Sequence, residues 1–197
     1  MARLEVWLPI ALGLAVAVGT VAWRERGRFQ GPTAPLLAIE AATGTARLAA
    51  LPARVGDGVG VGDPLRTGDG ATLRLRAPDG GHLRLGESTQ LRVLALVPLE
   101  VELVRGALAL DGGKTPRLIY SREATVATAG SLIEIRTEGG RTVIRLAEGR
   151  AQVEGRGGTS VELHGGERIQ IRAGVSTDGG ALPEADEDAE RELPLLF

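Results

Sequence analysis

The chain of 197 residues has no cysteine and few aromatic residues. Without cysteine there can be no disulfide, thiolate nucleophile or cysteine-bound metal, and the redox compartment is left open. Aromatic residues make up 3% of the chain, and Tyr120 is the only one between Phe29 and Phe197. A single ring cannot build the stacking surface on which single-stranded nucleic acids and sugar rings bind. Both ligand classes are therefore disfavoured.

The chain also lacks a strong excess of charge. Its formal net charge is -2, and the acidic residues near the carboxyl terminus hide a near balance between Leu36 and Gly174. A domain so close to neutral lacks the electrostatic footprint of a nucleic-acid-binding protein. Hydrophobic residues make up 43% of the chain, which is enough to bury one ordinary core. We expect one globular domain and no nucleic-acid partner.

One long uncharged run, from Val6 to Trp23, lies near the amino terminus. As a helix with a rise of roughly 1.5 Å per residue, it would be about 27 Å long, close to the hydrocarbon thickness of a bilayer. Trp7 and Trp23 stand at its two ends, where amphipathic rings favour the lipid headgroups. We predict a single membrane span, with residues 1–23 as the anchor. A cleaved signal peptide is the alternative, although Arg3 is the only basic residue before the run.

Small residues recur every four positions along this run, at Ala11, Ala15 and Gly19. They would give the helix a smooth ridge for packing against another membrane helix. The abundance of alanine throughout the chain is the competing explanation. Residues 24–35 contain glycine and proline and are expected to form a linker.

Between Leu36 and Gly174 the apolar residues recur with a period of two, and no window keeps the helical period for long. Turns rich in glycine and aspartate separate the alternating runs. This pattern predicts an all-β domain over residues 36–174, either a single antiparallel sandwich or a coil of short hairpins with strands of about four to seven residues. Residues 36–51 are expected to form a first strand pair. The alternating runs are Leu73/Leu75, Leu83/Leu85, Leu91/Val93, Val101/Leu103, Leu108/Leu110, Ile133/Ile135, Val143, Leu146, Val153, Val161/Leu163 and Ile169/Ile171.

The stretch TLRLRAPDGGHLRL, residues 72–85, alternates leucine with arginine. Because successive side chains of a strand point to opposite faces, the leucines should enter the core and the arginines should face solvent. A patch for an acidic partner is the alternative. Carboxylates at outward positions of other strands could pair with these arginines, for up to about 1 kcal/mol each. These carboxylates are Glu100, Glu102, Glu134, Glu154 and Glu162.

The residues that could carry chemistry form no catalytic or metal-binding pattern. His82 and His164 stand beside Gly-Gly turns without the partners of a metal site, so exposed turn positions are expected for both. The glycine-rich stretch 56–62 leads into a strand rather than a helix, which makes it a turn and not a phosphate-binding loop. The serines lack a nucleophile-elbow motif. We expect no enzyme activity, no cofactor, no metal and no small-molecule substrate.

Five segments in order resemble a FecR-type domain, covering about residues 55–173. VGDPLRTGDGATLRLRAPDGGHLRLGESTQLRV (61–93) is similar to the family's opening hairpin, and VELVRGALAL (101–110) to its "L-x-x-G-x-hydrophobic" step. ATVATAGSLIEI (124–135), TVIRLAEGRAQV (142–153) and VELHGGERIQI (161–171) are similar to the later steps. The resemblance implies an all-β domain in the periplasm, on the bacterial inner membrane, that engages other proteins.

In the regulatory members of that family, a cytoplasmic segment holds a sigma factor and a further carboxyl-terminal lobe receives a signal. Here only Met1–Glu5 precede the predicted span and 23 residues follow Gly174, so we expect neither part. The leading hypothesis is a membrane-anchored, non-catalytic accessory subunit of a membrane or envelope complex. A FecR-type signalling relay and binding of cell-wall polymer are the alternatives.

Partner contacts and the side of the membrane complete the prediction. The acidic residues of 175–197 end on an apolar stretch, and Leu195, Leu196 and Phe197 are candidates for binding a groove on a partner protein. A frayed terminus is the competing explanation. The resemblance places the β domain in the periplasm, whereas the arginines at 24, 26 and 28 favour a cytoplasmic carboxyl side.

Overall fold

The computed structural model describes residues 36–172, and this part of the chain contains only strands, turns and loops. The prediction of an all-β domain is confirmed. Among the described residues, no helix is long and apolar enough to cross a membrane. The predicted anchor over 1–23, the linker over 24–35 and the acidic tail over 175–197 lie outside these residues.

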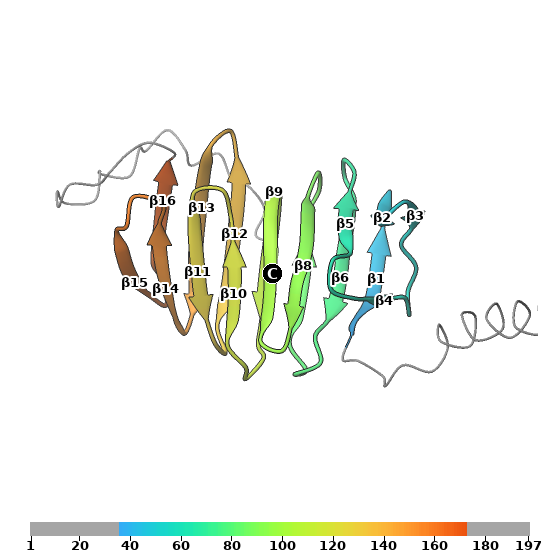
Figure 1. The fold of residues 1–197 in the computed structure, drawn as a ribbon, viewed down its shortest axis with the longest axis horizontal. Coiled ribbons are helices and arrows are strands. Elements are labelled where there is room, and N and C mark those ends of the chain that lie inside the picture. Colours follow the sequence, from blue (N-terminus) through green and yellow to red (C-terminus); the bar gives the residue numbers. More distant parts are fainter. Residues whose placement is uncertain (1–35, 173–197) are drawn as a thin grey trace, which may run out of the picture. The chain divides into compact units, whose positions relative to one another are not determined.

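The strands of residues 36–172 form two sheets that overlap in projection and enclose one hydrophobic core (Figure 1). Sheet A consists, in spatial order, of β4 (Gly58–Val59), β1 (Leu37–Thr43), β6 (Thr72–Arg76), β7 (His82–Leu85), the second half of β9 (Leu99–Asp111), β12 (Leu132–Glu138), β13 (Arg141–Glu148) and β16 (Arg168–Arg172). Sheet B consists of β3 (Leu51–Pro52), β2 (Ala46–Leu48), β5 (Pro64–Thr67), β8 (Gln90–Leu96), the first half of β9, β10 (Arg117–Tyr120), β11 (Ala124–Thr128), β14 (Arg150–Gly155) and β15 (Ser160–His164).

The alternation in β6 and β7 places side chains as expected. Leu73, Leu75, Leu83 and Leu85 are fully buried in the core, whereas the arginines between them point away from it. Burying each leucine contributes about 1.5–3 kcal/mol relative to leaving it exposed. A slip of one residue in register would exchange the leucines with the arginines, so this energy also sets the register.

Strand β9 belongs to both sheets. Its first half, Leu99–Arg105, pairs with β8 and β10, and its second half, Gly106–Asp111, pairs with β7 and β12. The alternating runs 101–103 and 108–110 lie in one strand of 13 residues, which is longer than the four to seven residues expected. A strand this long can stay buried because it passes from one sheet to the other.

The prediction of a wholly antiparallel domain is wrong at one pair. Strand β10 runs parallel to β9, with Arg117 opposite Leu99. After β9 ends in sheet A, residues 112–116 carry the chain back to sheet B, so β10 enters in the direction of β9. Parallel neighbours need such a crossover, because a tight hairpin can only reverse the chain.

The expected first strand pair is also wrong. Strand β1 pairs with β4 and β6 in sheet A, whereas β2 pairs with β3 and β5 in sheet B. Gly44 and Thr45 lie between β1 and β2 and carry the chain from one sheet to the other. The two strands therefore find their hydrogen-bond partners in different layers.

The crossing of β9 between the sheets depends on Gly106. Its φ is +91°, and a Cβ built there would overlap with Thr89. The Thr89 hydroxyl accepts a hydrogen bond from the Ala107 N–H at 2.9 Å and donates one to the Ala107 carbonyl at 3.2 Å. These bonds satisfy backbone groups at the bend, where the sheet ladder is interrupted.

A second crossing, from β13 to β14, repeats this arrangement. Gly149 has a φ of +92°, and a Cβ on it would overlap with Ser131. The Ser131 hydroxyl accepts a bond from the Arg150 N–H at 3.3 Å and donates one to the Arg150 carbonyl at 2.9 Å. Both crossings thus join a glycine with positive φ to a buried hydroxyl from a neighbouring segment.

Candidate functional site

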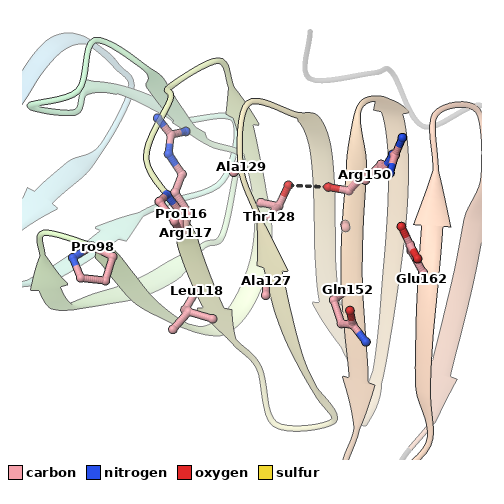
Figure 2. Close-up of a pocket in the computed structure, with 11 residues that line it drawn as sticks. Pro98, Pro116, Arg117, Leu118, Ala127, Thr128, Ala129, Arg150, Gln152 and Glu162 are labelled. Atoms are coloured by element: carbon pink, nitrogen blue, oxygen red, sulfur yellow. Dashed lines mark hydrogen bonds between the residues drawn. The ribbon is translucent and has the colours of Figure 1, made fainter.

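The outward face of sheet B combines apolar and acidic side chains. A row of register partners crosses it from Glu100 on β9 through Leu118, Ala127 and Gln152 to Glu162 on β15. Leu118 and Ala127 are half-buried and form the apolar middle of the row. An open hollow of about 440 Å³ lies here, lined also by Pro98, Pro116 and Arg150 (Figure 2). This face offers apolar contact with carboxylates at its rim.

A second hollow, of about 700 Å³, lies near the end of β10 and is lined by Tyr120, Glu102 and Glu154 among others. The Tyr120 hydroxyl donates a hydrogen bond to Glu100 at 3.3 Å. Burial and the Glu100 carboxylate raise the pKa of Tyr120, so the ring keeps its proton as a donor. Glu102 lies 3.6 Å from Arg92, and both side chains are exposed.

The outward face of sheet A is rich in arginine. Arg74 and Arg76 are exposed, as expected, and both pair with Glu40, at 3.4 and 2.9 Å. His82 Nδ1 lies 3.0 Å from the same carboxylate. Glu40 can meet three partners because it occupies an irregularity in the register between β1 and β6. Arg74 and Arg76 therefore pair with a carboxylate that the sequence analysis did not propose.

Glu134 corrects the expectation of a solvated carboxylate. It lies on the outward side of β12, opposite Ala109 on β9 and Arg145 on β13, yet its side chain is only 2% exposed. Its Oε1 accepts a hydrogen bond from Arg136 Nε at 2.6 Å. Glu134 lies in the interior of sheet A, between β9 and β13, rather than at an edge. The outward acids of sheet B are half-buried or exposed, as predicted.

The buried cation Arg117 was missed by the sequence analysis. Its side chain is 2% exposed, and its Nη2 donates to the two carboxylate oxygens of Asp79 at 3.0 and 3.1 Å. The Thr115 hydroxyl and the Gly81 N–H donate to the same carboxylate at 2.6 and 3.1 Å. The pair ties the β6–β7 hairpin to the segment that leads into β10.

Two glycines make room for the Arg117 guanidinium. A Cβ on Gly81 or on Gly113 would overlap with it. A sequence signal was present, because Arg117 shares the inward parity of Ile119 on β10, where an unpaired cation would be costly. The two Asp-Gly-Gly turns at 79–81 and 111–113 then mark where a carboxylate and space could be found.

Comparison with protein families gives a match to the family described as FecR protein, over residues 63–152. Residues 63–152 therefore match a FecR domain. The match runs from the turn before β5 into β14, so β15 and β16 complete the sheets beyond it. It is shorter at both ends than the resemblance over about 55–173.

Solved structures show the same fold. Two crystal structures of a "putative anti-sigma factor" from Parabacteroides distasonis are similar, each at 18% sequence identity, with TM-scores of 0.51 and 0.50. Each alignment covers 55% of this chain and 54% of the other, so the chain matches about half the length of these proteins. No match is found among curated proteins.

The fold explains two glycines in the segments that carry the resemblance, 101–110 and 142–153. The glycine of the "L-x-x-G-x-hydrophobic" step is Gly106, and the glycine after Glu148 is Gly149. Both stand where the chain passes between the two sheets. The motifs therefore encode crossings of the fold.

The histidines of this domain differ from each other. His82 is half-buried in β7 beside Glu40, so the prediction of an exposed turn position is wrong for it. His164 is exposed at the end of β15, as expected, and its backbone N–H donates a hydrogen bond to the Glu167 carboxylate. Within residues 36–172, no three His, Asp or Glu side chains gather as metal ligands.

The membrane-interface and partner-contact residues proposed from the sequence all lie outside the described part of the chain. They are Trp7, Trp23, Ala11, Ala15, Gly19, Leu195, Leu196 and Phe197.

The Asp79–Arg117 pair makes the stability of the β domain depend on pH in the acidic range. Burial by itself would raise the pKa of Asp79, but the bonds from Thr115 and Gly81 and the charge of Arg117 outweigh it, so the folded pKa lies below 3.8. A depressed pKa adds stability above the unfolded value, and that stability is lost as the pH falls through the folded value. The free energies of unfolding of wild type and Asp79→Asn, measured in urea, should therefore differ by a constant amount above about pH 5, and this difference should shrink below pH 3.8. If the difference in free energy stays constant down to about pH 2, the depressed pKa of Asp79 is contradicted.

Proposed function

We propose that this chain is a FecR-type signalling relay, in which the β domain transmits a signal by binding another protein. The match of residues 63–152 to the FecR family carries this proposal. The similarity in fold to the two structures named "putative anti-sigma factor" supports it. It takes precedence over the accessory-subunit role, which the comparisons support less well. The relay has the β domain in the periplasm and an anchor in the inner membrane.

The outward face of sheet B is the contact surface that we propose for the partner. Its hollow combines the apolar side chains of Leu118 and Ala127 with the carboxylate of Glu162, and Glu100 lies at the other end of the same row. Interfaces of this kind bury an apolar centre and surround it with a polar rim. A partner with apolar side chains flanked by basic residues fits this surface.

The proposal is tested by deleting the gene in the host bacterium and complementing it with the full chain. A relay predicts that deletion changes the transcription of a defined gene set, and that wild type restores it. Leu118→Arg should fail to restore it, because a cation replaces apolar contact in the centre of the hollow. Leu94→Arg is the matched control, since Leu94 is an exposed leucine of sheet B outside both hollows.

The same strains distinguish the signalling relay from the accessory-subunit role. Melting temperatures of both variants within about 4 °C of wild type would show that the domain still folds. If deletion leaves transcription unchanged while the detergent-solubilised chain co-purifies with a membrane enzyme, the accessory-subunit role is correct instead. If Leu118→Arg restores transcription fully, the partner binds elsewhere.

A further inference from the structure

Four arginines face one another at the edge of sheet A. On the outward side of β13 and β16, Arg141 stands opposite Arg172 and Arg145 stands opposite Arg168. One row of residues, Val143 opposite Gln170, separates the two pairs. We call Arg141, Arg145, Arg168 and Arg172 the arginine quartet. Side chains directly opposite in an antiparallel pair have Cβ atoms about 4.5–5.5 Å apart, so like charges there repel each other.

The repulsion affects Arg168 in particular. Partial burial lowers the pKa of its guanidinium, and the charges of Arg145 and Arg141 lower it further. The nearest acids on β12 offset this only in part. Glu134 stands opposite Arg145 but accepts its hydrogen bond from Arg136, and Glu138 is exposed and stands opposite Arg141. The quartet therefore favours the approach of further negative charge.

Strand β16 also forms an edge. Among the described residues it pairs only with β13, so its other side presents unpaired backbone N–H and C=O groups. The inward residues of this end, Ile169, Ile171 and Val161, are half-buried rather than covered. An edge of this kind can pair with an additional strand. Apolar side chains on that strand would bury the half-exposed isoleucines and valine further.

The chain itself supplies a segment with the matching chemistry. Residues 183–197, PEADEDAERELPLLF, hold six carboxylates and one arginine and then end on leucines and a phenylalanine. The carboxylates of this segment can pair with the arginine quartet, and its apolar end can cover the half-buried side chains of Ile169, Ile171 and Val161. Charge complementarity thus selects this segment over a neutral partner.

The length of chain also permits this contact. Residues 173–182 connect β16 to the acidic segment, and they could span up to roughly 33 Å when extended. Strand β16 of five residues is about 17 Å long. The connection is long enough to reverse direction and run beside β16.

We propose that the acidic segment 183–197 docks on the edge of sheet A, with its carboxylates on the arginine quartet and its apolar end over the half-buried isoleucines. The segment would then occupy the edge strand and withhold it from other chains. Release of the segment would expose a basic sheet edge. This device is separate from the surface of sheet B in the proposed function.

The test measures the distance between the two elements in the full chain, solubilised in detergent. Because the protein has no cysteine, spin labels can be attached at Ala147→Cys, exposed beside the quartet, and at Ala189→Cys, which leaves every tail charge in place. Labelled chain is diluted tenfold with unlabelled chain, and the distance distribution is recorded by double electron–electron resonance. Docking predicts one narrow distribution.

Charge reversal identifies the contact. Arg145→Glu with Arg168→Glu should broaden the distribution, and adding Glu187→Lys with Asp188→Lys should narrow it again. The matched control is Arg47→Glu with Arg66→Glu, a facing arginine pair on sheet B, which should leave the distribution narrow. The rescue variant also answers the objection that the reversed protein fails to fold.

Three results would overturn the proposal. A broad distribution in the wild-type sequence would show that the segment does not dock. A narrow distribution that charge reversal leaves unchanged would place the contact away from the quartet. A short distance that disappears on dilution would assign the edge to a second copy of the chain. None of these results bears on whether deletion alters transcription.

Discussion

Asp79→Asn lowers the free energy of unfolding of the β domain by about 3–5 kcal/mol. Asparagine keeps the size of the side chain and removes its charge. Arg117, only 2% exposed, is then left as a buried cation without a counter-charge. The surrounding turns cannot move away easily, since Gly81 and Gly113 lie against the guanidinium.

Urea unfolding of the full chain, followed by circular dichroism of the β-sheet signal, measures this loss. The matched control is Glu102→Gln, which breaks the ion pair with Arg92 at 3.6 Å, where the two side chains are 54% and 41% exposed. An exposed pair contributes at most about 1 kcal/mol, so the control should stay within that range. Equal losses in both variants would show that burial of Arg117 does not determine the energy.

Gly106→Ala is expected to destabilise the domain by about 3–5 kcal/mol. A non-glycine residue held at positive φ costs about 1–3 kcal/mol. Overlap of the new Cβ with Thr89 adds an overpacking cost of similar size. The substitution acts where β9 passes between the sheets, so a shift there disturbs the pairing of both halves of this strand.

The control for this prediction is Gly166→Ala. Gly166 has the same φ of +91°, but a Cβ on it would meet nothing within 4 Å. Only the backbone cost applies there, and we expect a loss of about 1–3 kcal/mol. The difference between the two variants in urea unfolding therefore isolates the contact with Thr89. If the two variants lose the same free energy of unfolding, the contact of the new Cβ with Thr89 contributes nothing to the loss.

The alternation of β6 and β7 shows what could be predicted from local pattern. A strand has a strict period of two, so Leu73 and Leu75 had to share one face and Arg74 and Arg76 the other. The assignment needed no knowledge of which sheet the strand would join. The same reasoning failed for Glu134, because solvent exposure depends on the neighbouring strands as well as on the face.

The partners of charged side chains were not predictable in the same way. The inward parity of Arg117 indicates that it needs a partner, but Asp79 lies 38 positions away along the chain and no local pattern identifies it as that partner. Glu40 meets Arg74 and His82 only because β1 has an irregular register beside β6. Such pairs depend on the topology that brings distant segments together.

By itself, the sequence determined the all-β class, the inward and outward faces of the strands, and the resemblance to the FecR family. These features follow from side-chain periodicity and from short motifs, which act over a few residues. Only the tertiary structure decided that β9 serves both sheets, that β10 runs parallel to it, and that four arginines gather at one edge. Each of these depends on which strands become neighbours, and neighbours are selected by burying one core shared by the whole domain.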